Sequence, residues 1–334
     1  MAPEYSEYHL GDLKLQSGEI LPDAKIVYKT HGELSARRDN VVIYPTWFNG
    51  QHTDNEWLIG EEMALNPAKY FIVVPNMLGN GLSTSPSNRP DLVKSGYPLV
   101  SVYDNVMAQR RLLTEKFGVD EVALAIGWSM GAQQAYHWGA LFPNNVLRLM
   151  PICGSAKTAS HNWVFLEGVK SVLTSAEDCA IGDNAALRAA GRVYAGWAFS
   201  QTFYRRQLWA TLGFSSLEEF IANFWDGFFV EKNRLDLLAM IATWQNSDIS
   251  QNSLYEGNLV HALSSIRAKT VVMPSSTDLY FTAEDSELEL PHIPGALFKP
   301  IDSVWGHAAG VGLNKQDSHF INAAIKGLLD DEKW

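Results

Sequence analysis

The sequence predicts an α/β fold, in which a mostly parallel sheet carries helices on both faces and is interrupted by a helical insertion. Short apolar runs alternate with helical patterns up to residue 149, and the alternation resumes at residue 270. Between these two parts the pattern is helical and rich in aromatic residues. Strands that alternate with helices are typical of a parallel sheet that is covered on both faces.

The expected elements follow the chain in order. We expect strands at residues 25–30, 41–45, 70–75, 122–126, 147–153, 270–274 and 297–301, and helices at 102–117, 132–142 and 320–329, with an amphipathic segment at 259–266. Residues 1–155 and 262–334 would form an α/β core domain, and residues 156–261 a helical cap over the edge of the sheet that carries the site. Most aromatic residues of this cap should serve helix packing, and a few should face a substrate.

Composition excludes several classes of function. The 334 residues carry a formal net charge of -11 and no basic cluster, which argues against binding of nucleic acid or of an anionic membrane. We find no secretory signal and no apolar run of membrane-spanning length. The two cysteines, Cys153 and Cys179, are too few for a disulfide framework or a metal cluster, and we expect both to be small packing residues. A cytoplasmic enzyme without cofactor or metal is expected.

A Gly-Trp-Ser-Met-Gly sequence occupies residues 127–131, between the expected strand at 122–126 and the expected helix at 132–142. This context is typical of a strained turn that projects a nucleophilic serine above the edge of a sheet. The flanking glycines leave room for the backbone to close around that turn. We therefore predict that Ser129 is a nucleophile. The alternative is a glycine-rich turn that contains a serine by chance.

A serine hydroxyl is a poor nucleophile unless a base accepts its proton and an acid orients that base. In this architecture the acid and then the histidine follow the serine along the chain. The histidines after Ser129 include His137, His161, His261, His292 and His307. Of these five, only His307 follows the last expected strand, so we predict that it is the base. The predicted acid is Asp278, just after the strand at 270–274, and Asp302 is the competing candidate.

Two backbone N–H groups should bind the oxyanion that forms during acyl transfer. One belongs to Met130, which follows the nucleophile at the N-terminus of a helix, where the helix dipole also favours negative charge. The other should come from an early strand-to-helix loop, for which residues 43–50 are the best candidate. Trp47 is the predicted donor in that loop, and its neighbours Thr46 and Phe48 remain alternatives.

With these residues identified, the chain resembles the homoserine O-acetyltransferase branch of the α/β-hydrolase fold over nearly its whole length. The resemblance rests on residues 75–85 (PNMLGNGLSTS), 127–134 (GWSMGAQQ), 153–156 (CGSA), 277–281 (TDLYF) and 306–307 (GH). It implies that Ser129, Asp278 and His307 form a catalytic triad, that the insertion is a cap and that the protein is a homodimer. In this branch a leucine commonly provides the early oxyanion amide, where this chain has Trp47.

Two functions share this machinery. The leading hypothesis is a serine carboxylesterase that cleaves short acyl esters, and the alternative is an O-acetyltransferase that moves an acetyl group from acetyl-CoA to homoserine or a similar alcohol. The chain has Ala132 and Ala308 where the family's acetyltransferases usually have glycine and aspartate. Arg192, Arg205 and Arg206 of the insertion could each supply a guanidinium to hold a carboxylate, and the alternative for each is a helix arginine that faces solvent. A third reading, an inactive binding protein, is disfavoured because the set of serine, aspartate and histidine is complete.

Overall fold

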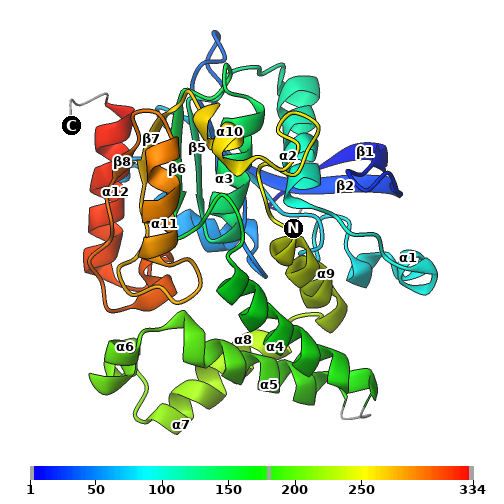
Figure 1. Cartoon of the computed structure of the whole chain (residues 1–334), viewed down its shortest axis with the longest axis vertical. Coiled ribbons are helices and arrows are strands. Elements are labelled where there is room, and N and C mark those ends of the chain that lie inside the picture. Colours follow the sequence, from blue (N-terminus) through cyan, green and yellow to red (C-terminus); the bar gives the residue numbers. More distant parts are fainter. Residues whose placement is uncertain (1–3, 179–181, 331–334) are drawn as a thin grey trace.

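The computed structural model describes residues 4–178 and 182–330 and contains one eight-stranded sheet (Figure 1). Its strands are β1 (Ser6–Lys14), β2 (Ile20–His31), β3 (Val41–Ile43), β4 (Phe71–Pro75), β5 (Leu124–Trp128), β6 (Arg148–Ile152), β7 (Lys269–Val272) and β8 (Leu297–Phe298). Their order across the sheet is β1-β2-β4-β3-β5-β6-β7-β8. Strand β2 pairs antiparallel with β1 and β4, and the pairs from β4 onward to β8 are parallel. The predicted fold class is therefore confirmed.

Strand β1 has no counterpart among the strands expected from the sequence. Only Leu10 and Leu13 of this strand are buried. Its pairing with β2 also shifts register on both sides of Gly11. An edge strand with one partner, irregular pairing and mostly exposed side chains does not show the alternation of apolar and polar residues that identifies a strand.

Helices surround the sheet and form the insertion. They are α1 (Pro90–Ser95), α2 (Val102–Arg111), α3 (Met130–Leu141), α4 (Ser160–Asp178), α5 (Asp183–Ala198), α6 (Gln201–Arg205), α7 (Leu217–Glu219), α8 (Gly227–Val230), α9 (Arg234–Gln245), α10 (Leu259–Ser264), α11 (Ala283–Glu289) and α12 (Lys315–Leu329). A π-helical turn, Leu112–Lys116, continues α2, so the helix expected at 102–117 is present with a change of hydrogen bonding near its end.

Successive side chains of the central strands enter two apolar cores on opposite faces of the sheet. On β3, Val41 and Ile43 join the core that contains α2 and α3. Val42 joins the core that contains α12 and the aromatic residues of the insertion. On β5, Ala125 faces the first core and Leu124 the second. Because both faces are covered, these strands appear in the sequence as continuous apolar runs.

Helices α4 to α8 lie together beyond one end of the sheet, at the bottom of Figure 1. They belong to the expected helical insertion, and the described residues of 156–261 contain none of the strands of the sheet. Helix α5 contacts the short turn η7 (Gly306–Gly310), which follows β8 and carries His307. We propose that the boundary between core and cap falls at residues 155/156 and 261/262.

Two further expectations concern the cysteines and the membrane. Cys153 is fully buried beside the nucleophile turn, whereas Cys179 lies outside the described residues. None of the helices in the described parts of the chain combines the length and apolar character that a membrane crossing requires.

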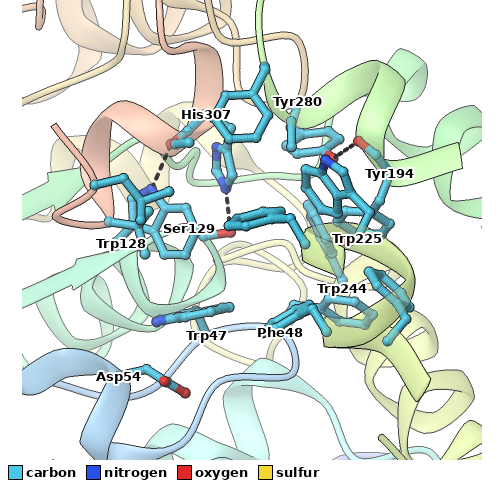
Figure 2. A pocket seen from close by; sticks show the side chains of 18 residues that line it. Trp47, Phe48, Asp54, Trp128, Ser129, Tyr194, Trp225, Trp244, Tyr280 and His307 are labelled. Carbon is cyan, nitrogen blue, oxygen red and sulfur yellow. Dashed lines mark hydrogen bonds between the residues drawn. The ribbon is translucent and has the colours of Figure 1, made fainter. Parts of the chain in front are cut away.

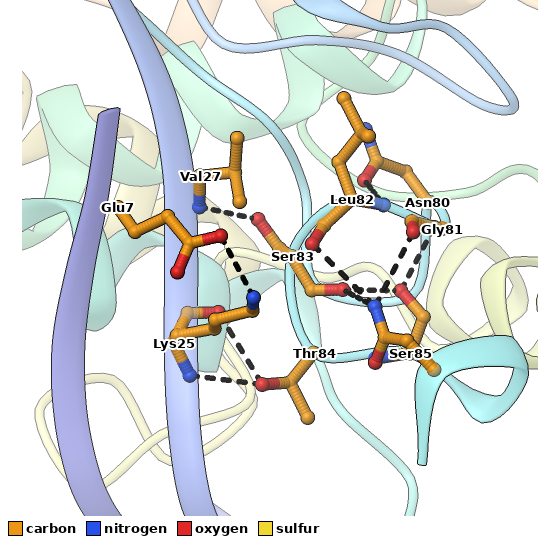
Figure 3. Close-up of polar contacts among 10 residues, drawn as sticks. Glu7, Lys25, Val27, Asn80, Gly81, Leu82, Ser83, Thr84 and Ser85 are labelled. Carbon is orange, nitrogen blue, oxygen red and sulfur yellow. Dashed lines mark hydrogen bonds and ion pairs between the residues drawn. The ribbon is translucent and has the colours of Figure 1, made fainter. Parts of the chain in front are cut away.

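The segment 75–85, which carries part of the family resemblance, is a hydrogen-bonded loop beside β2 (Figure 3). The Ser83 hydroxyl oxygen accepts the N–H of Val27 at 2.8 Å, and the Thr84 hydroxyl oxygen accepts the N–H of Lys25 at 2.8 Å. These hydroxyls take the place of a neighbouring strand, because they satisfy backbone donors that would otherwise lose their partners on burial. The serine and threonine residues of this segment therefore have a structural role.

The same loop supports the chain after β3. The Asn76 side-chain oxygen accepts the N–H of His52 at 3.0 Å, and the Asn80 side-chain amide donates to the carbonyl of Gly50 at 3.0 Å. All four residues are buried. These buried hydrogen bonds hold the backbone just after Trp47, the residue that the sequence analysis selects as an oxyanion donor.

Glu289, at the end of α11, joins the core to the start of the insertion. Its carboxylate oxygens both lie 3.0 Å from the N–H of Ala156, and one lies 3.3 Å from the N–H of Lys157. Burial raises the pKa of Glu289 to about 8, against the effect of these backbone donors, and the negative charges of Asp285 and Asp248 act in the same direction as burial. The folded protein therefore favours the protonated carboxyl group.

Replacing Glu289 with glutamine should change how stability depends on pH. The pKa of Glu289 is about 8 in the folded chain, and its ordinary value is 4.5. Protonation of Glu289 therefore stabilises the folded protein fully at low pH, and this stabilisation is lost as the pH rises from 4.5 to 8. Glutamine does not titrate, so the variant does not lose stability in this way. We expect the wild-type Tm minus the variant Tm to fall by at least about 3 °C between pH 5 and pH 8, measured by thermal unfolding. A difference that stays constant over this interval would contradict the burial argument.

Candidate active site

Ser129 occupies a strained turn between β5 and α3. Its backbone has φ 59 and ψ -127, a conformation that side-chain-bearing residues rarely adopt. A Cβ on Gly127 would lie 2.1 Å from the carbonyl oxygen of Gly131, and a Cβ on Gly131 would lie 2.8 Å from the carbonyl oxygen of Pro45. The glycines of the motif are therefore required by close backbone approach, as expected from their positions on either side of the nucleophile turn.

The structure brings Ser129, His307 and Asp278 together. The Ser129 Oγ lies 2.9 Å from His307 Nε2, and His307 Nδ1 lies 2.6 Å from Asp278 Oδ2. The other carboxylate oxygen, Oδ1, accepts the N–H groups of Tyr280 at 2.8 Å and Phe281 at 3.1 Å. The side chain of Asp278 is completely buried and that of His307 is 6% exposed. This is the hydrogen-bonding order of a nucleophile, a base and an orienting acid.

The competing candidates lie elsewhere. Asp302 is exposed and makes none of the contacts to His307. His137 is buried in α3 with its Nδ1 2.8 Å from the carbonyl oxygen of Gln133, and burial lowers its pKa to about 4. His137 is therefore a neutral core residue at ordinary pH.

The loop after β3 narrows the choice of oxyanion donors. The N–H of Thr46 donates to the carbonyl of Pro75 at 3.1 Å, so Thr46 is not free to bind an oxyanion. Within the described residues, the N–H groups of Trp47, Phe48 and Met130 have no protein acceptor. Met130 begins α3 directly after the nucleophile. The expectation of Trp47 and Met130 as donors is therefore kept as a proposal, with Phe48 as the remaining alternative.

Ser129 and His307 face a cavity of about 310 Å³ (Figure 2). Its lining is largely aromatic and comprises Trp47, Phe48, Asp54, Trp128, Ser129, Tyr194, Ala198, Phe199, Phe224, Trp225, Phe228, Phe229, Trp244, Tyr280, His307, Ala308, Val311 and Leu313. The insertion contributes many of these rings, as expected for a cap. The spacing of the aromatic residues in the sequence does not distinguish those that face the cavity from those that pack in the core.

Ionised side chains are scarce around this cavity. Among the lining residues that the structure describes, Asp54 is the one residue with a carboxylate, and none is a lysine or an arginine. Arg192 is turned toward Asp226, with Nε–Oδ1 and Nη2–Oδ2 distances of 3.1 and 2.8 Å. Arg205 and Arg206 are exposed and absent from the lining. The insertion's arginines therefore do not form a carboxylate-binding site in this cavity.

One departure from the family pattern has a structural explanation. A Cβ on Gly154 would lie only 2.3 Å from the Cβ of Ala132, so the extra methyl group at residue 132 occupies space that Gly154 leaves open. Ala308, the other departure, is buried and lines the cavity next to His307. An alanine there keeps the cavity free of a further negative charge.

A mostly parallel sheet of this strand order, with a Gly-Trp-Ser-Met-Gly turn between β5 and α3, defines the α/β-hydrolase class of fold. The proposed nucleophile, base and acid occupy the three loops at which that class carries them, in the chain order that it requires.

Comparison with known proteins gives the family. A family model described as alpha/beta hydrolase fold matches residues 40–183. An ethyl acetate hydrolase of Pseudomonas veronii is 36% identical over 335 residues, which cover 98% of this chain and 95% of the relative. A homoserine O-acetyltransferase of Cyclobacterium marinum is 27% identical over 89% of this chain and 88% of the relative. The solved structure of the acetyl esterase MekB matches with a TM-score of 0.94 and 35% identity, covering 98% of this chain and 96% of that one. The chain belongs to the α/β-hydrolase family, in the branch that joins such esterases with homoserine O-acetyltransferases.

Proposed function

We propose that this protein is a serine carboxylesterase that cleaves esters of short acyl groups, with Ser129 as nucleophile, His307 as base and Asp278 as acid. The observation that carries the proposal is the opening of Ser129 and His307 onto an apolar cavity of about 310 Å³. Such a cavity suits a small, neutral ester, because its aromatic side chains bury the apolar surface of the ester. The same lining has few charged groups that could pair with a charged substrate. The relatives named ethyl acetate hydrolase and acetyl esterase make acetyl esters the first substrates to test.

The first half-reaction forms an acyl-enzyme. His307 Nε2 takes the proton of the Ser129 hydroxyl as its oxygen attacks the ester carbonyl carbon, while Asp278 holds the other ring proton on Nδ1 and stabilises the imidazolium. The N–H groups of Met130 and Trp47 bind the carbonyl oxygen as it becomes negative. The carbon–oxygen bond to the alcohol then breaks, and the imidazolium gives its proton to the departing oxygen.

The second half-reaction returns the enzyme to its starting state. A water molecule gives a proton to His307 Nε2 as its oxygen attacks the acyl carbon, and Ser129 Oγ leaves and takes that proton back. The products are an alcohol and a carboxylic acid. A transferase would replace this water with a bound alcohol, and the described residues that line the cavity include no lysine or arginine to hold the carboxylate of homoserine. Hydrolysis is therefore favoured over transfer.

Product analysis tests this proposal. The protein is incubated with p-nitrophenyl acetate or ethyl acetate, with and without homoserine, and the products are followed by mass spectrometry. We expect free acetate at a rate that homoserine does not change. In a parallel reaction acetyl-CoA is the donor. Efficient formation of O-acetylhomoserine in that reaction would overturn the esterase proposal in favour of the O-acetyltransferase.

We also propose that the protein is a cytoplasmic homodimer. The homodimer is supported by the resemblance to a family whose members are commonly dimers. Light scattering coupled to size-exclusion chromatography should give twice the chain mass of 37.1 kDa. A monomeric mass at micromolar concentration would contradict the dimer.

A further inference from the structure

We propose that Trp128 is a positioning residue whose indole holds His307 in the orientation that proton transfer from Ser129 needs. The inference rests on the proposed function, because it concerns the base of that reaction. Trp128 is the last residue of β5 and directly precedes Ser129. It is 7% exposed and lines the cavity. The strand that carries the nucleophile thus also carries a group in contact with the base.

The indole holds His307 in two ways (Figure 2). Its Nε1–H donates a hydrogen bond to the backbone carbonyl oxygen of His307, at 3.1 Å. The indole and imidazole rings also lie close, with centroids 4.5 Å apart and planes inclined by 30°. The hydrogen bond fixes the main chain of the η7 turn, and the ring contact limits rotation of the imidazole. Both restraints act on the 2.9 Å separation between Ser129 Oγ and His307 Nε2.

The remaining rings around His307 come from the loop that carries the acid. The rings of Tyr280 and His307 pack in a T-shaped arrangement, with centroids 4.8 Å apart and planes inclined by 81°, and the Phe281 ring centroid lies 5.6 Å from that of His307. The backbone N–H groups of these two residues bind Asp278. They therefore organise the acid and enclose the imidazole, whereas Trp128 ties the histidine to the nucleophile strand.

Glycines make room for this arrangement. A Cβ on Gly310 would lie 2.2 Å from Cδ1 and 2.5 Å from Nε1 of Trp128. The indoles of Trp128 and Trp47 pack in a T-shaped arrangement, with centroids 4.7 Å apart and planes inclined by 81°. A Cβ on Gly50 would lie 2.6 Å from Cε2 of Trp47. Two indoles, each packed against a glycine, thus connect the nucleophile turn, the histidine turn and the loop of the proposed oxyanion donor.

The ring contact also fits the chemistry. When His307 takes the serine proton it becomes a cation, and the face of an indole attracts a cation that lies within about 6 Å of its centre. The centroid separation of 4.5 Å is inside that range. Trp128 would therefore favour the imidazolium that forms as the tetrahedral intermediate develops, in addition to orienting the ring.

Two variants test the contact from opposite sides. Trp128→Phe removes the indole N–H, and Gly310→Ala places a methyl group where the indole lies. For each we measure kcat and KM for p-nitrophenyl acetate and the rate at which a fluorophosphonate labels Ser129. Each variant should lose one buried hydrogen bond and, with it, the alignment of the His307 imidazole with the Ser129 hydroxyl. We expect kcat and the labelling rate to fall by about tenfold, and KM to change by less than about threefold. The double variant should lose little more than one single variant, because both substitutions remove the same contact.

Matched controls separate this role from ordinary packing. Trp138→Phe removes an indole whose Nε1–H donates to Gln109 at 2.8 Å in the opposite core, and Gly168→Ala adds a methyl group in open space. We expect both controls to be labelled within about twofold of the wild-type rate, with Trp138→Phe lowering Tm through its lost hydrogen bond. Folding of all variants is checked by thermal unfolding.

The outcomes distinguish the two proposals. If the wild-type protein neither hydrolyses the ester nor reacts with the probe, the esterase function fails and the role of Trp128 fails with it. If the wild type is labelled at Ser129 and folded Trp128→Phe and Gly310→Ala proteins react at the wild-type rate, only the role of Trp128 is overturned. Multiplicative losses in the double variant would also overturn it, because the two sites would then act independently.

Discussion

Replacing Ser129 with alanine is expected to lower kcat for ester hydrolysis by at least about ten-thousandfold, because no acyl-enzyme can form without the attacking oxygen. The Ser129 Oγ has its hydrogen bond with His307 and otherwise faces the cavity. Alanine removes that oxygen without adding any group that must be accommodated. Ser129 has φ 59, and we expect alanine to keep this backbone conformation, so the strain of the turn should be similar in both proteins.

Steady-state hydrolysis of p-nitrophenyl acetate measures the loss, and thermal unfolding and circular dichroism show that the fold is kept. We expect a change in Tm of less than about 1.5 °C, which corresponds to roughly 1 kcal/mol for a chain of this size. If a folded Ser129→Ala protein retained a tenth of the wild-type kcat, the assignment of Ser129 as the nucleophile would be wrong. Fluorophosphonate labelling of the wild type, located by peptide mass spectrometry, gives an independent check.

The kcat of the Asp278→Asn variant is expected to fall by about ten-thousandfold, because asparagine places a hydrogen-bond donor opposite His307 Nδ1 where aspartate has an acceptor. In the wild type, Oδ1 accepts two backbone N–H groups, from Tyr280 and Phe281, and Oδ2 faces His307 Nδ1. An asparagine should keep its oxygen where those two donors point. Its NH₂ group then faces Nδ1 and donates to it, which places the ring proton on Nε2. A protonated Nε2 cannot accept the proton of Ser129.

Asp302→Asn is the matched control for this variant. It makes the same chemical change on an exposed aspartate at the other end of the histidine loop. We expect its kcat to stay within about twofold of the wild type, because an exposed carboxylate exerts a weak, screened effect on a distant group. If Asp302→Asn were the more damaging change, the acid would be Asp302 and the assignment of Asp278 would be wrong.

Strong local patterns explain why so much of the fold was predictable. The run at 122–126 and the glycines of 127–131 predict a strand followed by a sharp turn, and β5 and α3 meet there. The last strand was less well predicted, since the expected strand at 297–301 is only Leu297–Phe298, continued by an isolated bridge at Ile301. Strand β1 is missed because an edge strand buries few of its side chains. Patterns in sequence report burial, so they are weakest where burial is least.

The choice of acid depends on loop position. The expectation that the acid occupies its own loop, upstream of the histidine loop, favours Asp278 over Asp302, and the structure places the Asp278 carboxylate 2.6 Å from the histidine ring. The choice of oxyanion donor shows where loop position is not sufficient. Thr46, Trp47 and Phe48 are adjacent, and only the hydrogen bond from the Thr46 N–H to Pro75 removes one of them.

The sequence by itself determines the class of fold, the nucleophile turn and the candidates for base and acid, because these depend on local periodicity, on glycine positions and on the order of loops along the chain. Only the tertiary structure decides which rings line the cavity, that Arg192 is occupied by Asp226, and that Trp128 contacts the backbone and ring of His307. These contacts join residues far apart in the chain, such as Trp128 and Gly310. An aromatic residue that packs and one that faces a substrate have the same local pattern, so their difference arises only when distant segments come together.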